Sequence, residues 1–248
     1  KWGEVEREPL RSVRRATAEQ MARSWSQIPH VMTRDEVDIT ALEALRKRYK
    51  PAVEERGGKL TLTIFGLKAL VNALKRYPKF NASLDVESGE IVLKHYYHVG
   101  VAVDTDRGLI VPVLRDVDRK SVVELAVELT ELVERTRAGK ADLAELKGGT
   151  MTITNVGAIG GTGFAPIINF PEVAILGLAQ ARVKPVAQER EDVDPDAPLD
   201  ERYEFVPRLM LPVILTFDHR VNDGAEAQRF LNAVIEQLKD PEKLLLGL

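Results

Sequence analysis

Apolar residues in the first third of the chain recur with the period of an α-helix. The spacing predicts a short helix over residues 13–25, a second helix that begins at a capping box formed by Thr40 and Glu43, and a third over residues 63–77. Pro51 is expected to end or kink the second helix. The third helix carries an apolar stripe of Ile64, Leu67, Val71 and Leu74.

The middle of the chain changes to the pattern of β-strands. Val, Ile and Leu are frequent in six short runs, and residues 106–108 form a good hairpin turn between two of them. A capping box at Ser121 and Glu124 opens an amphipathic helix that Gly139 closes, and apolar residues at helical spacing mark a final helix over residues 227–238. The expected strands are 90–94, 98–104, 109–115, 150–156, 173–178 and 211–217.

These elements indicate one α+β domain, in which a mostly β centre is flanked by helices. Residues 1–11 are polar and lack a period, so they are interpreted as an N-terminal arm or the end of a linker, and the domain is expected to span residues 12–248. Residues 188–202 are acidic and contain two prolines, which predicts a solvated hairpin loop.

Composition excludes several classes of protein and of site. The 248 residues carry 35 Lys plus Arg against 38 Asp plus Glu, so the net charge of −3 gives no general attraction to nucleic acid or to an anionic membrane. The absence of cysteine excludes disulfides, thiolate zinc sites and a cysteine nucleophile. No apolar run approaches the roughly 18 residues that span a bilayer, and the N-terminus resembles neither a signal nor a transit peptide.

His219 is the strongest candidate for catalysis among the four histidines. It follows the apolar strand at 211–217 and precedes Asp223, which can cap the final helix together with Glu226. A histidine held at the end of a rigid strand can serve as a base in a cleft, although by composition alone a packed or solvent-facing histidine is the commoner case. Asp218 and Arg220 are expected to form a local surface pair of little energetic value.

A second candidate lies where the strand at 150–156 enters a glycine-rich loop. Hydroxyl and amide groups of residues 152–157 could stabilise an oxyanion, although threonine is also simply favoured in strands. The loop glycines fit neither a phosphate loop nor a dinucleotide fingerprint. The run from His95 to His98 has the look of a metal or aromatic cluster, but alternate strand residues face opposite sides, so packing is the better interpretation. His30 is given no chemical role.

The segment from His219 to Gly224 resembles the His-x-x-x-Asp-Gly signature of dihydrolipoyl acyltransferases, the core enzymes of 2-oxo acid dehydrogenase complexes. The more distant chloramphenicol acetyltransferases share this element. The resemblance extends over nearly the whole chain, most closely to acetyltransferase members, and is carried by residues 28–31, 37–40, 100–113, 152–157 and 164–177.

The resemblance implies a chloramphenicol-acetyltransferase-like fold with a mixed β-sheet and a trimeric building block. Active sites would lie between subunits, with His219 as general base from one chain and the Thr154 hydroxyl as oxyanion donor from its neighbour. Asp223 would orient the site through an ionic contact, with Arg14 or Arg15 as possible partners. Coenzyme A would be a substrate, the lipoyl group would arrive on a separate domain, and no metal would be needed.

The same resemblance implies the partners. Trimers would assemble into a larger cage, and a lipoyl domain, a 2-oxo acid dehydrogenase and dihydrolipoamide dehydrogenase would act with it through domains that this sequence lacks. The location would be the cytoplasm in a bacterium or archaeon and the mitochondrial matrix in a eukaryote, without secretion. Alternatives left open are a branched-chain or succinyl acyltransferase, or an assembly scaffold with little catalysis. A free acetyltransferase of the chloramphenicol type is disfavoured by residues 164–177.

Overall fold

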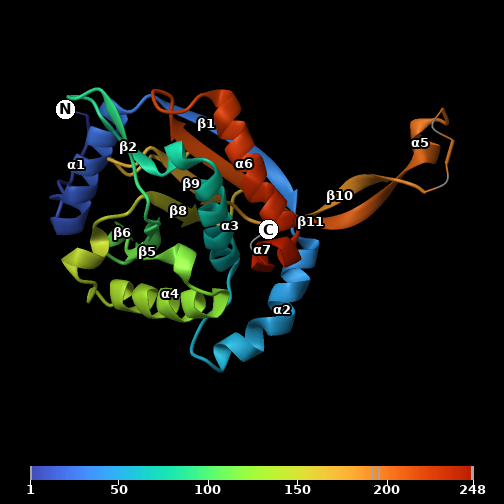
Figure 1. Ribbon diagram of the computed structural model, residues 1–248. Coiled ribbons are helices and arrows are strands. Elements are labelled where there is room, and N and C mark those ends of the chain that lie inside the picture. The colour runs from blue at the N-terminus through green and yellow to red at the C-terminus, as the bar shows by residue number, and fades with distance from the viewer. Residues whose placement is uncertain (1, 192, 195, 247–248) are drawn as a thin grey trace.

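The computed structural model describes residues 2–191, 193–194 and 196–246, and its centre is a mixed β-sheet (Figure 1). Strand β8 runs parallel to both of its neighbours, and the other strand pairs are antiparallel. The sheet order is β1 (His30–Asp38), β11 (Tyr203–Asp218), β9 (Ala174–Leu178), β8 (Met151–Asn155), β4 (Val99–Val101) and β7 (Val113–Leu114), and β10 (Arg182–Glu189) pairs with β11.

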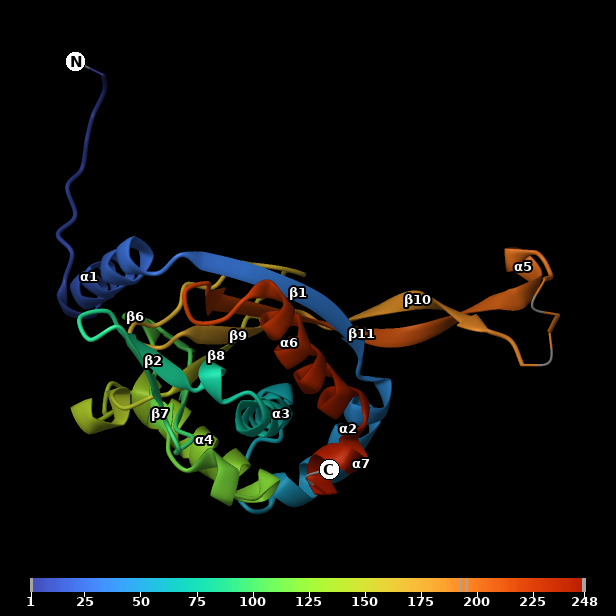
Figure 2. The ribbon, with the colours of Figure 1, turned by 45° about the horizontal axis from the view of Figure 1, so that its top comes forward.

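Most of the helices lie together on one side of this sheet, and two short hairpins accompany it (Figures 1 and 2). The hairpins pair β2 (Ala82–Asp85) with β3 (Glu90–Leu93) and β5 (Val103–Thr105) with β6 (Gly108–Ile110). Among the described residues, no helix is both long and apolar enough to cross a bilayer. The α-helices are α1 (Ser12–Gln27), α2 (Thr40–Glu54), α3 (Leu62–Arg76), α4 (Val122–Arg137), α5 (Leu199–Arg202), α6 (Gly224–Lys239) and α7 (Pro241–Leu246).

The main core lies between the sheet and the helices α3 and α6. Helix α3 is apolar on most of its surface, and its buried side chains pack against α6, β8 and β9. Gly66 allows this approach, because a Cβ at that position would lie 3.0 Å from Ile153 Cδ1 and 3.1 Å from Leu178 Cδ1. Successive strand residues alternate between the two faces. In β8, Ile153 points into this core, so Thr152 and Thr154 point to the face of the sheet that is turned away from α3.

Several expected helix boundaries are confirmed. Ser121 and Glu124 form a reciprocal capping box at the start of α4, and Asp223 and Glu226 form another at the start of α6. Gly139 follows α4 with a φ of 70°, the left-handed conformation typical of a glycine that ends a helix. The predicted turn at 106–108 is also present, although the flanking runs each divide into two shorter strands.

The predicted capping box at Thr40 is wrong. Asp38 provides the cap instead, since its Oδ1 accepts the backbone N–H of Thr40 at 2.9 Å and the Thr40 hydroxyl at 2.5 Å. Glu43 binds Arg46 one turn later, at 2.7 Å. Pro51 does not end α2, which continues to Glu54 with the proline inside it. The Asp38 carboxylate, two residues before the first residue of α2, thus caps the helix in place of the Thr40 hydroxyl.

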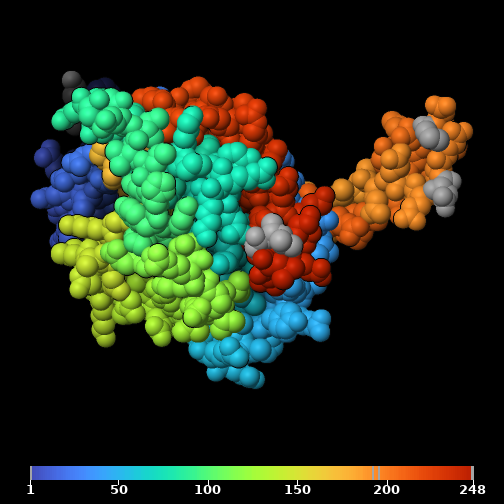
Figure 3. Space-filling model, in the orientation of Figure 1, coloured from blue at the N-terminus to red at the C-terminus, as the bar shows by residue number. Residues whose placement is uncertain are grey.

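Strands β10 and β11 form a long hairpin that projects from the body of the molecule (Figures 1 and 3). The predicted solvated loop at 188–202 corresponds to its tip, where the chain leaves β10, forms the short helix α5 and enters β11. Residues 192 and 195 of that segment lie outside the described part. The described residues from 190 to 202 include none that is buried, which agrees with a solvated tip. Residues 2–11 extend away from the body on another side (Figure 2).

Candidate active site

A cavity of about 330 Å³ lies on the face of the sheet that is turned away from α3. Helix α1, strands β6, β8 and β9, and the loop between β8 and β9 supply its walls. Nine of its twelve lining residues are apolar, so the cavity suits an uncharged part of a substrate. The lining residues are Met21, Ala102, Leu109, Val111, Thr152, Thr154, Val156, Phe164, Pro166, Ile167, Asn169 and Ile175.

The two threonines of β8 that line the cavity differ in their hydrogen bonding. The Thr152 hydroxyl donates to Oε2 of Glu172 at 2.7 Å. The Thr154 hydroxyl makes no hydrogen bond within the described part of the chain. A hydroxyl without a partner in an apolar cavity remains available to donate to a bound group. Of the two, Thr154 is therefore the residue that can serve a substrate.

Glu172 is a buried carboxyl next to this cavity, with only 3% of its surface exposed. Burial raises its pKa from 4.5 to about 7, because the charged form loses its hydration. Hydrogen bonds from Thr152 and Asn169 and the positive charge of Lys94 act in the opposite direction but do not cancel this effect. Sequence reasoning missed Glu172, and its position after Pro171 in the loop gave no signal of a buried carboxyl.

His219 lies in the turn that follows β11, and its side chain is exposed. Its backbone N–H donates to the carbonyl oxygen of Pro29 at 3.2 Å, and its ring centroid is 5.9 Å from that of Phe217. The imidazole makes no hydrogen bond within the described residues. The backbone is thus anchored at the sheet end while the side chain is free to meet a partner.

The residues on either side of His219 clamp this turn. The Asp218 carboxylate accepts the Nε–H and an Nη2–H of Arg220, the latter at 2.7 Å. It also accepts the backbone N–H of Arg220 at 2.9 Å. Asp218 is only 1% exposed, so the expectation of a surface pair is wrong: the pair exists, but its carboxylate is buried. A buried, multiply bonded carboxylate fixes the turn more firmly than a surface pair would.

Asp223 is placed as the cap of α6. Its Oδ1 accepts the backbone N–H of Glu226 at 2.7 Å. No ion pair joins it to an arginine within the described residues of this single chain, and Arg14 instead lies close to Gly108 in the β5–β6 turn. An ionic contact with Arg14 or Arg15 stays a prediction for the assembled protein.

One subunit does not bring His219 and Thr154 together. Thr154 is level with Gly177 in β9, which is level with Ile214 in β11. Asp218, which immediately precedes His219, lies four residues further along β11, or about 14 Å at ~3.4 Å per residue, and the two strand spacings add about 10 Å across the sheet. His219 is also absent from the lining of the cavity. Both groups could act on one substrate only if a second subunit supplied one of them.

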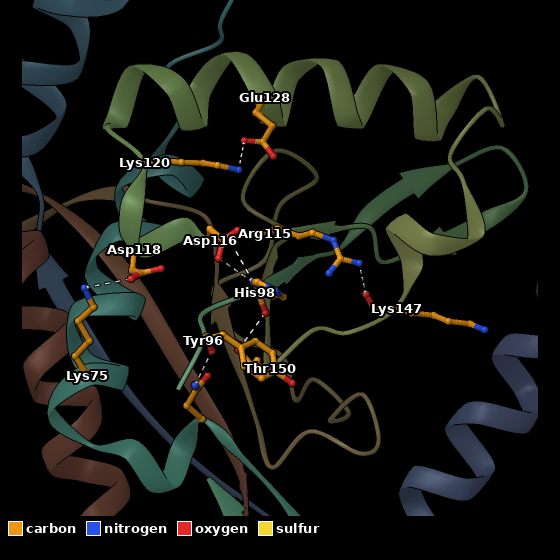
Figure 4. A network of polar contacts seen from close by, with 11 residues as sticks. Lys75, Tyr96, His98, Arg115, Asp116, Asp118, Lys120, Glu128, Lys147 and Thr150 are labelled. Carbon is orange, nitrogen blue, oxygen red and sulfur yellow. Dashed lines mark hydrogen bonds and ion pairs between the residues drawn. The ribbon is translucent and has the colours of Figure 1, made fainter. Parts of the chain in front are cut away.

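The histidine run at 95–98 makes packing contacts. No group of three or more potential metal ligands occurs among the residues that the structure describes. Figure 4 shows that His98 belongs to a packing network, in which its Nδ1 accepts the backbone N–H of Asp116 at 3.0 Å and its carbonyl oxygen accepts the backbone N–H and hydroxyl of Thr150. These residues lie in a bend before β4 rather than on a strand, but the interpretation as packing is supported.

Comparison with known proteins identifies the family. The sequence model of the protein family described as 2-oxoacid dehydrogenases acyltransferase (catalytic domain) matches residues 3–246 of this chain. The chain belongs to this family. It is 44% identical, over 96% of its length, to the dihydrolipoyllysine-residue acetyltransferase component of pyruvate dehydrogenase complex of Staphylococcus aureus, of which it covers 53%. The corresponding Cupriavidus necator protein is 43% identical over 99% of this chain and 42% of its own length. The chain thus spans about half the length of the curated relatives it matches.

Solved structures of this acyltransferase family share its fold. An Azotobacter vinelandii dihydrolipoamide acetyltransferase, studied for the role of a serine, a histidine and an asparagine in its catalytic mechanism, gives a TM-score of 0.89 at 43% identity and covers 98% of this chain and 95% of its own. The cubic core of the pyruvate dehydrogenase multienzyme complex gives 0.89 at 42% identity, with the same coverage. Chloramphenicol acetyltransferase, at 17% identity and a TM-score of 0.53 over 89% of this chain and 94% of its own, shares the fold alone. The predicted chloramphenicol-acetyltransferase-like fold is confirmed.

Proposed function

We propose that this chain transfers an acetyl group between a dihydrolipoyl thiol and coenzyme A, as the acetyltransferase core of a pyruvate dehydrogenase complex. The observation that carries the proposal is the Thr154 hydroxyl, which has no hydrogen-bond partner among the described residues and lies in an apolar cavity of an acyltransferase-family chain. The names of the relatives in Staphylococcus aureus and Cupriavidus necator favour acetyl over branched-chain or succinyl groups. They equally favour catalysis over a role as scaffold alone.

His219 acts as the general base in this reaction. A thiol with a pKa of about 8.5 is mostly protonated at neutral pH, and an imidazole with a pKa of about 6.5 is suited to remove its proton. The coenzyme A sulfur then forms a bond to the carbonyl carbon of the acetyl-dihydrolipoyl thioester. The clamp between Asp218 and Arg220 holds the backbone of His219 during this proton transfer.

The Thr154 hydroxyl donates to the oxyanion that this attack creates. When the tetrahedral intermediate collapses, the bond between carbonyl carbon and dihydrolipoyl sulfur breaks, and the imidazolium of His219 returns its proton to the leaving sulfur. Acetyl-CoA and dihydrolipoyl thiol are the products, and the enzyme recovers its starting protonation state. Asp223 fixes the helix that follows the histidine turn through its cap on α6.

The active site is completed by assembly. His219 and Thr154 are too far apart along the sheet to act on one carbonyl within a subunit, so we place the site between neighbouring copies of a trimer. The relation to a solved cubic core supports further association of trimers into a cage. A lipoyl domain would deliver the acyl group, and the 2-oxo acid dehydrogenase and dihydrolipoamide dehydrogenase components complete the set of partners.

The test of the proposal is the rate of acetyl transfer from acetyl-CoA to dihydrolipoamide. We expect His219→Ala to lower kcat by about 10² to 10⁴, the usual effect of losing a general base. His95→Ala is the matched control, because His95 is also exposed but lies in the bend before β4 and has no part in the proposed reaction, so kcat should stay unchanged. Near-normal transfer by the His219 variant at an unchanged oligomeric state would contradict the proposal.

A further inference from the structure

The cavity has three polar side chains in its lining, and Glu172 engages two of them. The Thr152 hydroxyl donates to Oε2 of Glu172, and the side chain of Asn169 also donates to this carboxylate. The side-chain Oδ1 of Asn169 accepts the Nε2–H of Gln20 at 3.2 Å. Thr154 is thereby left as the one lining side chain whose donor is uncommitted, within the described part of the chain.

The carboxyl is held in this position at an energetic cost. Gly149 lies so close that a Cβ there would be 2.9 Å from Oε1 of Glu172, which shows that the carboxyl is packed directly against backbone. The positive charge of Lys94, which is itself half-buried, lowers the pKa of this carboxyl without cancelling the effect of burial. Burying a carboxyl is unfavourable compared with burying an apolar side chain of the same size. A function that requires a hydrogen-bond acceptor would explain why a carboxyl, and not an apolar side chain, occupies position 172.

We propose that Glu172 is a positioning residue: it binds the Thr152 hydroxyl, so that Thr154 and not Thr152 donates the hydrogen bond to the acyl carbonyl in the cavity. Thr152 lies two residues before Thr154 on the same face of β8 and is a second possible donor to the substrate carbonyl. Glu172 prevents this, because its carboxylate accepts the hydrogen of the Thr152 hydroxyl. The inference rests on the proposed function, because it concerns the carbonyl that Thr154 is proposed to serve.

The consequence of losing this acceptor follows from hydrogen-bond energetics. A buried hydroxyl without a partner is unfavourable, so the freed hydrogen of Thr152 would turn to an acceptor that enters the cavity. The carbonyl of the acyl group is such an acceptor, and in this alternative pose it is displaced from Thr154. A substrate that also binds in an unproductive pose lowers kcat and KM by the same factor and leaves kcat/KM unchanged.

Four variants separate this role from a structural one. Glu172→Met removes the acceptor at similar size, Glu172→Gln keeps an acceptor without charge, and Thr152→Val removes the competing hydroxyl at nearly constant shape. In the transfer from acetyl-CoA to dihydrolipoamide, we expect Glu172→Met to lower both kcat and the KM for acetyl-CoA, which carries the acyl carbonyl, about tenfold. This corresponds to one hydrogen bond of ~1.4 kcal/mol. Glu172→Gln and Thr152→Val should each lower kcat less than Glu172→Met does, because neither leaves a Thr152 hydrogen without an acceptor. The double variant Glu172→Met/Thr152→Val should recover the kcat of Thr152→Val.

Recovery of kcat in the double variant is the decisive outcome. Non-additivity of this kind shows that Glu172 acts through Thr152. If the double variant is as slow as Glu172→Met, or if Glu172→Met changes kcat with KM constant, the inference is wrong. Thermal unfolding of each variant shows whether a loss of turnover reflects loss of folded protein. If the wild-type chain transfers no acetyl group, the proposed function is wrong and this inference with it. If the wild type is active and the Glu172 variants have the same kcat and KM as the wild type, only the inference is wrong.

Discussion

At the scale of single residues, the molecule distinguishes two threonines that look equivalent in the sequence. Thr152 and Thr154 lie on the same strand and face the same side, yet the Thr152 hydroxyl is bound to Glu172, whereas the Thr154 hydroxyl makes no hydrogen bond to any residue that the structure describes. The sequence alone could indicate oxyanion chemistry near residues 152–157, and the resemblance to a family singled out Thr154. The reason for the difference could not be predicted, because it depends on a carboxyl 20 positions further along the chain.

The buried carboxyl of Glu172 should make stability depend on pH. Its pKa rises from 4.5 to about 7 on folding, so the folded protein binds this proton more tightly than the unfolded chain does. The contribution to the free energy of unfolding therefore falls as pH rises from about 4.5 to about 7, by up to ~3 kcal/mol in total. Glu172→Gln has no proton to lose, so its stability relative to the wild type should increase between pH 4.5 and pH 8. Denaturant unfolding of both proteins at these two pH values measures it, and an unchanged difference would contradict the assigned shift.

At the scale of elements, strongly patterned segments were predicted and charged strands were not. The helices now labelled α3, α4 and α6 were each marked by an apolar stripe, and for α4 and α6 a capping box also showed the start. Strand β1 was missed, because Arg34, Asp35 and Glu36 interrupt its alternation, as is common for a strand at the edge of a sheet. Strand β10 was missed for a related reason: it is exposed along most of its length, so no core face imposes a period on it.

The exposed hairpin tip should contribute little to the stability of the fold. Replacing residues 190–202 by Asn-Gly joins Glu189 to Tyr203, which already face each other across the hairpin, through a two-residue turn. Because the described residues of this segment include none that is buried, the free energy of unfolding should change by less than ~0.5 kcal/mol.

A substitution in the body of the same strand is the control for that experiment. Phe217 is 1% exposed, and Phe217→Ala should cost about 3 to 5 kcal/mol of unfolding free energy. Chemical denaturation of the shortened and substituted proteins gives both values. A shortened hairpin that destabilises the chain as much as Phe217→Ala does would mean that the tip belongs to the folding core.

At the scale of the whole molecule, the two residues of the proposed active site lie at separate places in the chain. The Thr154 hydroxyl lies in a cavity on one face of the sheet, and the backbone of His219 is anchored beyond the end of β11; neither side chain makes a hydrogen bond to the described residues. The absence of cysteine is consistent with this division, since both reacting sulfurs would belong to the substrates. The central claim is that assembly brings the hydroxyl of one copy to the histidine of the next.

Co-assembly of two inactive variants tests that claim most directly. The measurement is acetyl transfer by His219→Ala and Thr154→Ala chains expressed together in equal amounts, beside wild type expressed with the double variant. If each site takes its histidine and threonine from different chains of a trimer, both mixtures should show about a quarter of wild-type activity, because random assembly restores about one site in four. If each chain holds a complete site, the first mixture would stay inactive while the second kept about half, and that result would contradict the account.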